Sequence, residues 1–471
     1  MESSIASTSD ETRRADVAPR SGCGPFTGGL TICRQTKRQP VDHVQENRYE
    51  DHRAWYVLGL LFAAYTLSFL DRQILSILFQ PIKLEMDLSD TQLGLLGGIA
   101  LALFYATLGL PLAMLADRSN RVRIVTGSLV VFSTMTAACG VAQNFWQLFL
   151  ARIGVGVGEA GVNPSSHSII ADIFPHERRS TAMGVLATGA NVGQLLGLVI
   201  GGVLSTYYGW RVAIVAVGLP GLLLAVVFRL TVTEPQRGAS EGRAASGSAP
   251  PLKESLLYMW RNQAMRHLII GSMLKGTAGY GVGSWLPSLF IRSHGLTGAQ
   301  VGLLLGLLSG ILGGTGALLG GYLNDRLSKR EAGNGLAFIA LATAGVYPLA
   351  VGAYLSGDLR LAVALILIPV FVNNMFLAPS LALVQSLARV RMRAVASAVK
   401  MLTLNLVGLG LGPFAVGFFS DSLQSSFGER SLGIAMSIVA SSGVWGALHF
   451  YISSRHMEAG LQMAAEDETQ T

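Results

Sequence analysis

The sequence predicts an all-α integral membrane protein with twelve transmembrane helices in two related six-helix bundles. Hydrophobic residues make up 51% of the 471 residues and charged residues only 13%, whereas soluble domains average about 25% charged. Apolar runs long enough to cross a membrane recur along most of the chain, and motifs of the first half return in the second. These three observations exclude a soluble, collagen-like or disulfide-stapled protein.

A helix that crosses the hydrocarbon core of a bilayer needs about 20 mostly apolar residues. Such runs occur at 55–80, 92–115, 122–142, 146–171, 181–206, 211–230, 266–291, 298–323, 335–356, 360–386, 394–420 and 431–453. A charged, Pro/Gly/Ser-rich stretch separates the sixth run from the seventh. We therefore expect a tail over 1–54, bundles over 55–230 and 263–453, a linker over 231–262 and a tail over 454–471.

Lysine and arginine are distributed unequally between the two sets of connectors. The connectors after helices 2, 4, 8 and 10 hold eleven of them, whereas those after the odd-numbered helices hold five, namely Lys83, Arg211, Arg292, Arg360 and Arg430. Because cytoplasmic loops retain basic residues, both termini are expected in the cytoplasm, in a bacterial inner membrane. The tail 1–54 holds eight basic and eight acidic residues and no signal-peptide core, which predicts a disordered cytoplasmic extension.

The two halves repeat each other at nearly constant spacing. The pair Asp117-Arg118 returns 208 residues later as Asp325-Arg326. A second set of matches is 215 residues apart and includes Pro164 with Pro379. Internal repeats of this kind are typical of secondary transporters, which hold their substrate between the halves near the middle of the membrane.

Glycine occurs at every fourth position in two of the expected helices. The rows are Gly189, Gly193, Gly197 and Gly201 in the fifth helix, and Gly302, Gly306, Gly310 and Gly314 in the eighth. Residues four apart share a helix face, so each row predicts close approach of another backbone. The rows serve ordinary packing, and smooth faces of this kind also suit two bundles that rock against each other.

The segment Asp117-Arg118-Ser-Asn-Arg121, its partner Asp325-Arg326 and the six-plus-six layout resemble the major facilitator superfamily of transporters. That resemblance implies the major facilitator fold over about 55–453. It also implies that Asp117, Arg118, Arg121, Asp325 and Arg326 form a gate latch at the cytoplasmic ends of the halves. The alternative is that these residues only set topology. Ala113 stands where the family usually has glycine.

Two further segments resemble the Spinster branch of that superfamily. They are Leu70-Asp71-Arg72-Gln73 in the first helix and RIGVGVGEAG, from Arg152 to Gly161, in the fourth. The resemblance implies a proton-linked or facilitative carrier of amphipathic lipids, such as lysophospholipids and sphingoid phosphates. The other interpretation is a symporter of small organic anions or sugar acids, because carriers of those solutes have similar Glu-Ala stretches.

Five ionisable residues lie inside the apolar runs: Asp71, Arg72, Arg152, Glu159 and Lys275. A charge at the bilayer centre costs about 2.5–3.5 kcal/mol on insertion scales, so such residues usually face a cavity and have a partner. Arg152 and Glu159 are two helical turns apart and share a face, whereas Asp71 and Arg72 diverge by about 100°. Their formal charges leave the site slightly positive, which suits an anion.

These charges lead to the site hypothesis. We expect Asp71 and Glu159 to take up and release protons and, when ionised, to pair with Arg152 or Arg72. We expect Arg72, Arg152, Lys275 and Asn374 to contact the substrate, since the fork of an arginine can bind two oxygens of a phosphate or carboxylate. The 215-residue repeat maps Glu159 onto Asn374, so the proton sites are expected in the N-terminal half only. The alternative is static ion pairing that holds the first and fourth helices together.

Other classes of function fit the sequence less well. The eight histidines are scattered, with no HExxH motif, so an enzyme is not expected. The charges are concentrated on two helices, whereas channels favour rings of charges or carbonyls. We expect a monomer among membrane lipids that binds a small-molecule or lipid substrate and protons, with no metal, cofactor or nucleic acid.

Overall fold

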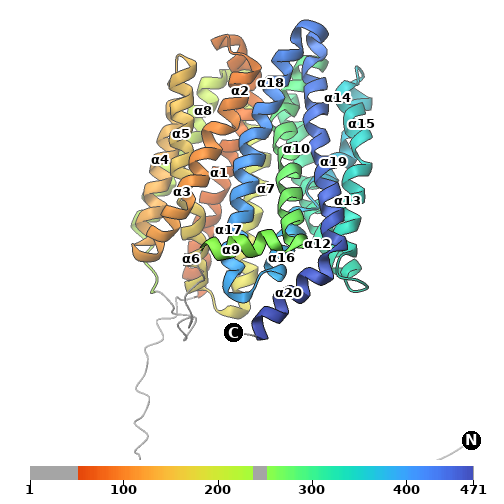
Figure 1. Ribbon diagram of the computed structural model, residues 1–471. Helices are drawn as coiled ribbons and strands as arrows, with labels where there is room; N and C mark the ends of the chain where they lie inside the picture. The colour runs from red at the N-terminus through yellow and green to blue at the C-terminus, as the bar shows by residue number, and fades with distance from the viewer. Residues whose placement is uncertain (1–50, 237–251, 470–471) are drawn as a thin grey trace, which may run out of the picture. The chain divides into compact units, whose positions relative to one another are not determined.

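The fold is all-helical in the computed structural model, which describes residues 51–236 and 252–469. The expected disordered tail therefore lies almost entirely outside the described residues. The N-terminal half consists of α1 (Asp51–Met86), α2 (Asp90–Gly97), α3 (Ile99–Arg118), α4 (Arg121–Val141), α5 (Phe145–Glu159), α6 (Val162–Ile173), α7 (His176–Tyr208) and α8 (Trp210–Thr231). These helices pack alongside one another (Figure 1).

The C-terminal half begins with a short helix, α9 (Leu252–Arg261), inside the stretch expected to be a linker. It continues with α10 (Gln263–His294), α11 (Gly298–Leu307), η1 (Leu308–Gly313), α12 (Gly314–Ser328), α13 (Asn334–Gly345), α14 (Tyr347–Leu355), α15 (Leu359–Asn373) and α16 (Leu377–Leu387). The remaining elements are η2 (Val390–Met392), α17 (Arg393–Thr403), η3 (Leu404–Leu409), α18 (Gly410–Phe427), η4 (Gly428–Arg430), α19 (Ser431–Arg455) and α20 (Met457–Thr469).

The twelve-helix prediction is confirmed. Nine stretches of the described residues are long and apolar enough to cross a membrane, and one of them, Val395–Arg455, contains the last two expected spans. The fourth expected span corresponds to α5 with α6, and the seventh to α10. The fourth is divided into two helices of 15 and 12 residues, each too short to be counted alone, and α10 is long enough but less apolar than the nine.

Two spans are broken at equivalent points of the repeat. The first interruption follows Glu159, between α5 and α6, and the second follows Asn373, between α15 and α16. Glu159 and Asn374, which the 215-residue repeat relates, thus both lie where a helix ends near the middle of its span. Two π-helical segments, η1 and η3, interrupt spans of the C-terminal half, and such π segments frequently mark functional sites.

The two glycine rows pack against different partners. The row in α7 faces α1 of its own half, where a Cβ at Gly197 would be 2.7 Å from the carbonyl oxygen of Leu70. The second row begins in α11 and faces α7 across the boundary between the halves, where a Cβ at Gly302 would overlap the backbone of Leu198. Gly314 is the exception, since a Cβ there would meet nothing within 4 Å. Only the second row therefore belongs to an interface between the bundles.

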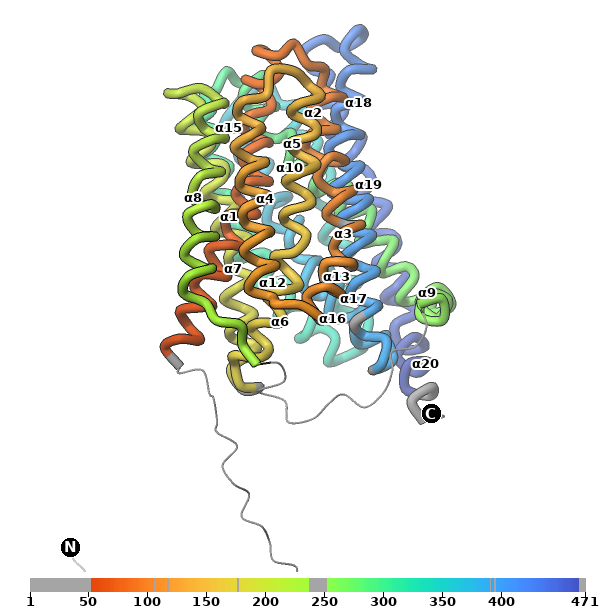
Figure 2. Tube along the Cα trace, turned by 90° about the vertical axis from the view of Figure 1, so that its left-hand side faces the viewer, coloured from red at the N-terminus to blue at the C-terminus, as the bar shows by residue number. Residues whose placement is uncertain are grey.

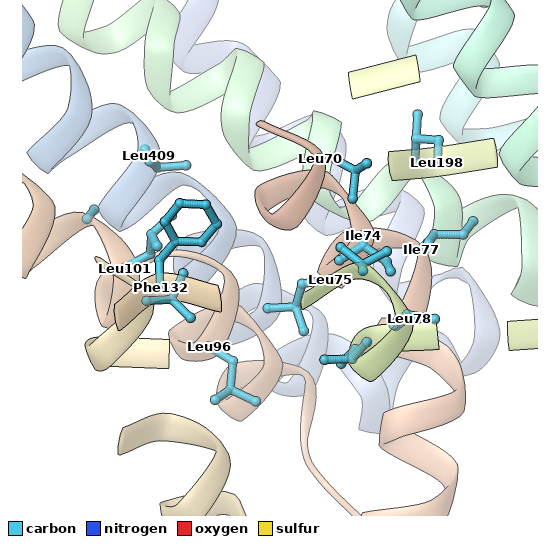
Figure 3. Close-up of a cluster of buried hydrophobic side chains, with 14 of the residues drawn as sticks. Leu70, Ile74, Leu75, Ile77, Leu78, Leu96, Leu101, Phe132, Leu198 and Leu409 are labelled. Atoms are coloured by element: carbon cyan, nitrogen blue, oxygen red, sulfur yellow. The ribbon is translucent and has the colours of Figure 1, made fainter. Parts of the chain in front are cut away.

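The hydrophobic core extends across the boundary between the halves. One cluster of buried side chains includes Leu101 and Phe132 of the N-terminal half and Leu409 of the C-terminal half. Figure 3 shows these three side chains on one side of the cluster and the α1 side chains Leu70 and Ile74 on the other. The two bundles thus share apolar packing around the middle of the molecule.

Candidate functional site

Two ion pairs connect α1 to α5 inside the N-terminal half. The Arg72 guanidinium donates through Nε to Glu159 Oε2 at 2.6 Å, and its Nη2 lies 2.6 Å from the same oxygen. Arg152 Nη1 donates to Asp71 Oδ2 at 2.8 Å, and the Thr136 hydroxyl donates to Asp71 Oδ1 at 2.6 Å. The pairing is crossed because neighbouring residues on α1 point about 100° apart.

The two pairs differ in how much of their bonding capacity is used. Both oxygens of Asp71 accept hydrogen bonds, whereas Glu159 Oε1 is buried and has no hydrogen-bond partner among the described residues. The Glu159 side chain is completely buried, and that of Arg72 is 12% exposed. Glu159 therefore keeps one free acceptor oxygen while its other oxygen holds the arginine.

Aromatic rings hold the Arg72 guanidinium in place. Its central carbon lies 4.4 Å from the ring centroid of Tyr105 and 5.1 Å from that of Phe69, which are favourable cation–π distances. The amide of Asn163, on α6, donates to the Tyr105 hydroxyl at 2.9 Å. The helix break after Glu159 thus brings residues on both sides of the interruption to the same arginine.

A cavity of about 320 Å³ lies between the halves, next to these charges. Its polar lining from the N-terminal half includes Arg72, Gln73, Asn191 and Gln194, and from the C-terminal half Lys275, Tyr280, Asn373 and Asn374. Apolar side chains make up much of the remaining wall, for example Leu286, Ile366, Leu404 and Val444. The cavity therefore combines two cationic side chains with apolar surface.

Lys275 is the cation that the C-terminal half contributes. It is 6% exposed, and its Nζ donates to Asn373 Oδ1 at 2.7 Å. Gly279 leaves room for this amide, since a Cβ there would be 3.1 Å from the Asn373 side chain. An amide oxygen satisfies one ammonium proton but carries no formal charge, so no ion pair among the described residues neutralises Lys275 at the cavity wall.

The structure brings together most of the expected site residues and separates two of them. Arg72, Lys275 and Asn374 line the cavity, and Asn374 also donates to the Val370 carbonyl at 3.1 Å. Arg152 and Asp71 bind each other and lie outside the cavity lining. Glu159 does not line the cavity itself but binds Arg72, which does.

The expected gate residues occupy the ends of α3, α4 and α12. Arg118, Asp325 and Arg326 are exposed, and the side chain of Asp117 lies outside the described residues. Arg121 is 1% exposed and, among the described residues, bonds to Glu234 at 2.7 Å, to Asp172 and to the Ser168 hydroxyl at 2.9 Å. In this conformation, Arg121 therefore ties α4 to α6 and to the segment after α8.

A latch between the halves lies at the opposite end of the helices, around Asp90. Arg292 of α10 binds both carboxylate oxygens of Asp90, at 2.7 and 2.8 Å. Lys83 and the Ser420 hydroxyl donate to the same carboxylate at 2.5 and 2.7 Å. Asp421 in turn accepts from the backbone N–H of Thr91 at 2.7 Å.

Sequence reasoning missed this latch. Asp90 follows Ser89 at the start of α2, which is an ordinary helix-capping pattern. The signal that could have revealed it is the pair of basic residues, Lys83 and Arg292, in connectors that are otherwise poor in lysine and arginine. Further contacts between the halves at this end include the rings of Phe79 and Trp285, whose centroids are 5.0 Å apart.

Twelve membrane-spanning helices, two repeated bundles and a charged cavity between them define a multi-pass membrane carrier. The family model described as "Major Facilitator Superfamily" matches residues 61–413. The chain belongs to this superfamily, whose family and fold are those of transporters.

The chain is 32% identical over 419 residues to an MFS-type efflux pump of Mycolicibacterium smegmatis, covering 88% of this chain and 96% of that protein. It is 28% identical over 404 residues to the cis,cis-muconate transport protein of Acinetobacter baylyi, covering 83% and 94%. A crystal structure of a bacterial homologue of the human lysosomal transporter Spinster, inward-facing and unoccupied, is similar with a TM-score of 0.79. The identity to it is 28%, and the match covers 86% of this chain and 98% of that one. The expected resemblance to the Spinster branch is confirmed.

Proposed function

We propose that this chain is a proton-coupled secondary transporter that moves a small amphipathic or anionic solute by alternating access. The solute class proposed first is a lysophospholipid-like or sphingolipid-like amphiphile. The observation that carries the proposal is the Arg72–Glu159 pair at the cavity wall, with its free carboxylate oxygen.

The coupling follows from the two states of Glu159. When Glu159 is ionised, it neutralises Arg72, and Lys275 is the unneutralised cation at the cavity. A proton on the unpartnered Oε1 cancels the carboxylate charge and so weakens its hold on the guanidinium. Arg72 then becomes available to an anion, since its planar fork binds two oxygens of a phosphate or carboxylate.

Protonation and substrate binding therefore favour each other. A proton on Glu159 raises the affinity for an anion, and by linkage a bound anion raises the affinity of Glu159 for the proton. Asp71 is the second proposed proton site, but protonating it requires loss of bonds to both Arg152 and Thr136. We propose Glu159 as the main site, and Arg152 as the partner that holds Asp71 behind the cavity wall.

The cavity wall supports an amphiphile because it offers an anion site beside apolar side chains such as Leu286 and Ile366. The resemblance to the Spinster branch supports the same class. The second candidate is a symporter of small organic anions or sugar acids. It is favoured by the similarity to a protein named for cis,cis-muconate transport and by the amides Asn191, Gln194 and Asn373 in the cavity wall.

The proposed location is a bacterial inner membrane, with both termini in the cytoplasm and one chain as the working unit. The distribution of basic residues supports this orientation. In it, the latch at Asp90 closes the external end, and Asp117, Arg118, Arg121, Asp325 and Arg326 stand at the cytoplasmic end. We propose that these five residues stabilise the alternative conformation, in which that end closes.

Two measurements test the proposal. Purified protein is screened for thermal stabilisation by single-chain phospholipids and by sugar acids, and the stabilising compound is then used for uptake into proteoliposomes with and without a pH gradient. We expect a lysolipid to stabilise the protein and the gradient to drive its accumulation. Stabilisation by sugar acids alone would select the second candidate, and accumulation that ignores the gradient would refute proton coupling.

A further inference from the structure

The helix α9 has three different faces. Leu252, Leu256, Leu257 and Trp260 are between 43% and 61% exposed and lie within an arc of about 140° on a helix that turns about 100° per residue. The exposed Lys253 lies within the same arc. Ser255, Tyr258 and Met259 are buried on a second arc, against α10 and α17. Glu254 and Arg261 occupy the sector between them.

The axis of α9 runs across the direction of the spanning helices. Figure 1 shows α9 lengthwise beneath the label of α17, and Figure 2, turned by 90°, shows it nearly end-on. A single residue, Asn262, separates it from α10. Asn262 caps α10 by accepting from the Met265 N–H at 3.1 Å and donates to the Gly460 carbonyl at 3.1 Å, which fixes the corner between the helices.

The length of α10 places this corner in the interfacial layer of a bilayer. Its 32 residues span about 48 Å at 1.5 Å per residue, whereas the hydrocarbon core is about 30 Å thick. The first turns of α10 therefore extend beyond the hydrocarbon, and α9 lies at their level. A helix there with an exposed apolar face is suited to lie in the plane of the headgroups.

The charges around α9 indicate which lipids it meets. Within residues 252–469, Lys253, Arg261 and Arg266 form no ion pair with a carboxylate. The guanidinium carbon of Arg266 lies 5.4 Å from the centroid of the Trp260 ring. Arg389, by contrast, pairs with Glu254 at 3.5 Å and stacks on Tyr258. Three cations beside an apolar face complement the phosphates of an acidic bilayer surface.

We propose that α9 is an interfacial anchor whose Leu252, Leu256, Leu257 and Trp260 face inserts among acyl chains while Lys253, Arg261 and Arg266 bind the phosphates of anionic phospholipids. Bound in this way, α9 fixes the start of α10 at the membrane surface. The first turns of α10, the helix that carries Lys275, therefore stay at a constant depth in the membrane.

Depth-dependent quenching of Trp260 tests the insertion. The full chain is placed in nanodiscs with phospholipids brominated either near the carbonyl or near the chain end, and the Trp260 signal is taken as the difference between wild type and Trp260→Phe. We expect stronger quenching by the shallow bromine. Trp445 of α19, 62% exposed within a span, is measured in the same way as the deep control. Equal Trp260 fluorescence in brominated and unbrominated discs would overturn the proposal.

Lipid selectivity tests the charges. Enrichment of labelled phosphatidylglycerol over phosphatidylcholine around the protein is measured for wild type, for Lys253→Gln/Arg261→Gln/Arg266→Gln, and for Arg430→Gln at the far end of the bundle. We expect the triple variant to lose enrichment by up to about fivefold per cation, and Arg430→Gln to retain it. Unchanged enrichment in the triple variant would overturn the anionic-lipid site, as would capture of a second copy by α9 instead of lipid.

Discussion

The two halves of the carrier treat buried charge in opposite ways. In the N-terminal half, four buried ionisable side chains form two ion pairs, Arg72 with Glu159 and Arg152 with Asp71. In the C-terminal half, Lys275 meets only the neutral amide of Asn373 among the described residues. The comparison teaches that helices related by a repeat can have different chemistry: the N-terminal half pairs its buried cations with carboxylates, and the C-terminal half pairs Lys275 with an amide.

The largest effect is expected from breaking the better-satisfied pair. Arg152→Met leaves Asp71 buried without its cation, and removing one partner of a buried pair typically costs about 3–5 kcal/mol. We expect a strong loss of thermal stability in detergent, measured by unfolding of the purified variant. The double variant Asp71→Leu/Arg152→Met should recover most of the loss. A single variant as stable as wild type would show that the pair contributes little.

A smaller effect, on substrate affinity, is expected at Lys275. Lys275→Met removes the charge-assisted contact to the anion, worth about 1.5–3 kcal/mol, so the apparent KM for the transported anion should rise about tenfold to a hundredfold. Lys400→Met is the matched control, because Lys400 is a buried lysine of α17 outside the cavity lining. Equal changes in KM for both variants would mean that Lys275 acts through the fold and not on the substrate.

A substitution in the latch around Asp90 is expected to have a smaller effect, since Lys83 and Ser420 still bind the Asp90 carboxylate after Arg292 is removed. Arg292→Gln should shift the balance of conformations by about 1.5 kcal/mol. Cross-linking of Thr206→Cys with Ala299→Cys reports this, because the Ala299 N–H donates to the Thr206 hydroxyl at 3.0 Å across the halves. We expect the ratio of the closed to the open conformation to fall about tenfold in Arg292→Gln, which slows cross-linking, and an unchanged rate would show that the latch does not hold the halves together.

The smallest effect is expected at an exposed pair. Glu85 binds Arg211 at 2.8 Å, with side chains 49% and 35% exposed, and exposed pairs contribute about 0–1 kcal/mol. Glu85→Gln should therefore change the unfolding temperature far less than Arg152→Met does. A comparable loss would indicate that burial does not determine the strength of these pairs.

The fold could be predicted from hydropathy and repeats because crossing a bilayer demands long apolar runs. The helix breaks after Glu159 and Asn373 were not predicted, since neither has a proline at the break itself and the segment after Asn373 stays apolar. The residues of the ion pairs were predictable because charges are costly in a membrane. Their crossed pairing was not, because it depends on how α1 and α5 are rotated.

Two other features could not be predicted from the sequence. The helix α9 lies in a stretch that reads as a linker, and its apolar face is too short for a membrane span. The latch depends on Asp90 meeting Arg292, two residues 202 positions apart. Contacts at that distance along the chain follow from the packing of the two bundles, which no local pattern encodes.

The most direct test of the account compares Glu159→Gln with Lys275→Met in the same proteoliposomes. Each variant is assayed for substrate exchange at equal pH and for accumulation driven by a pH gradient of one unit, which supports about tenfold accumulation per coupled proton. The account predicts that Glu159→Gln retains exchange and loses accumulation, whereas Lys275→Met binds its substrate weakly in both assays. Full gradient-driven accumulation by Glu159→Gln would contradict it.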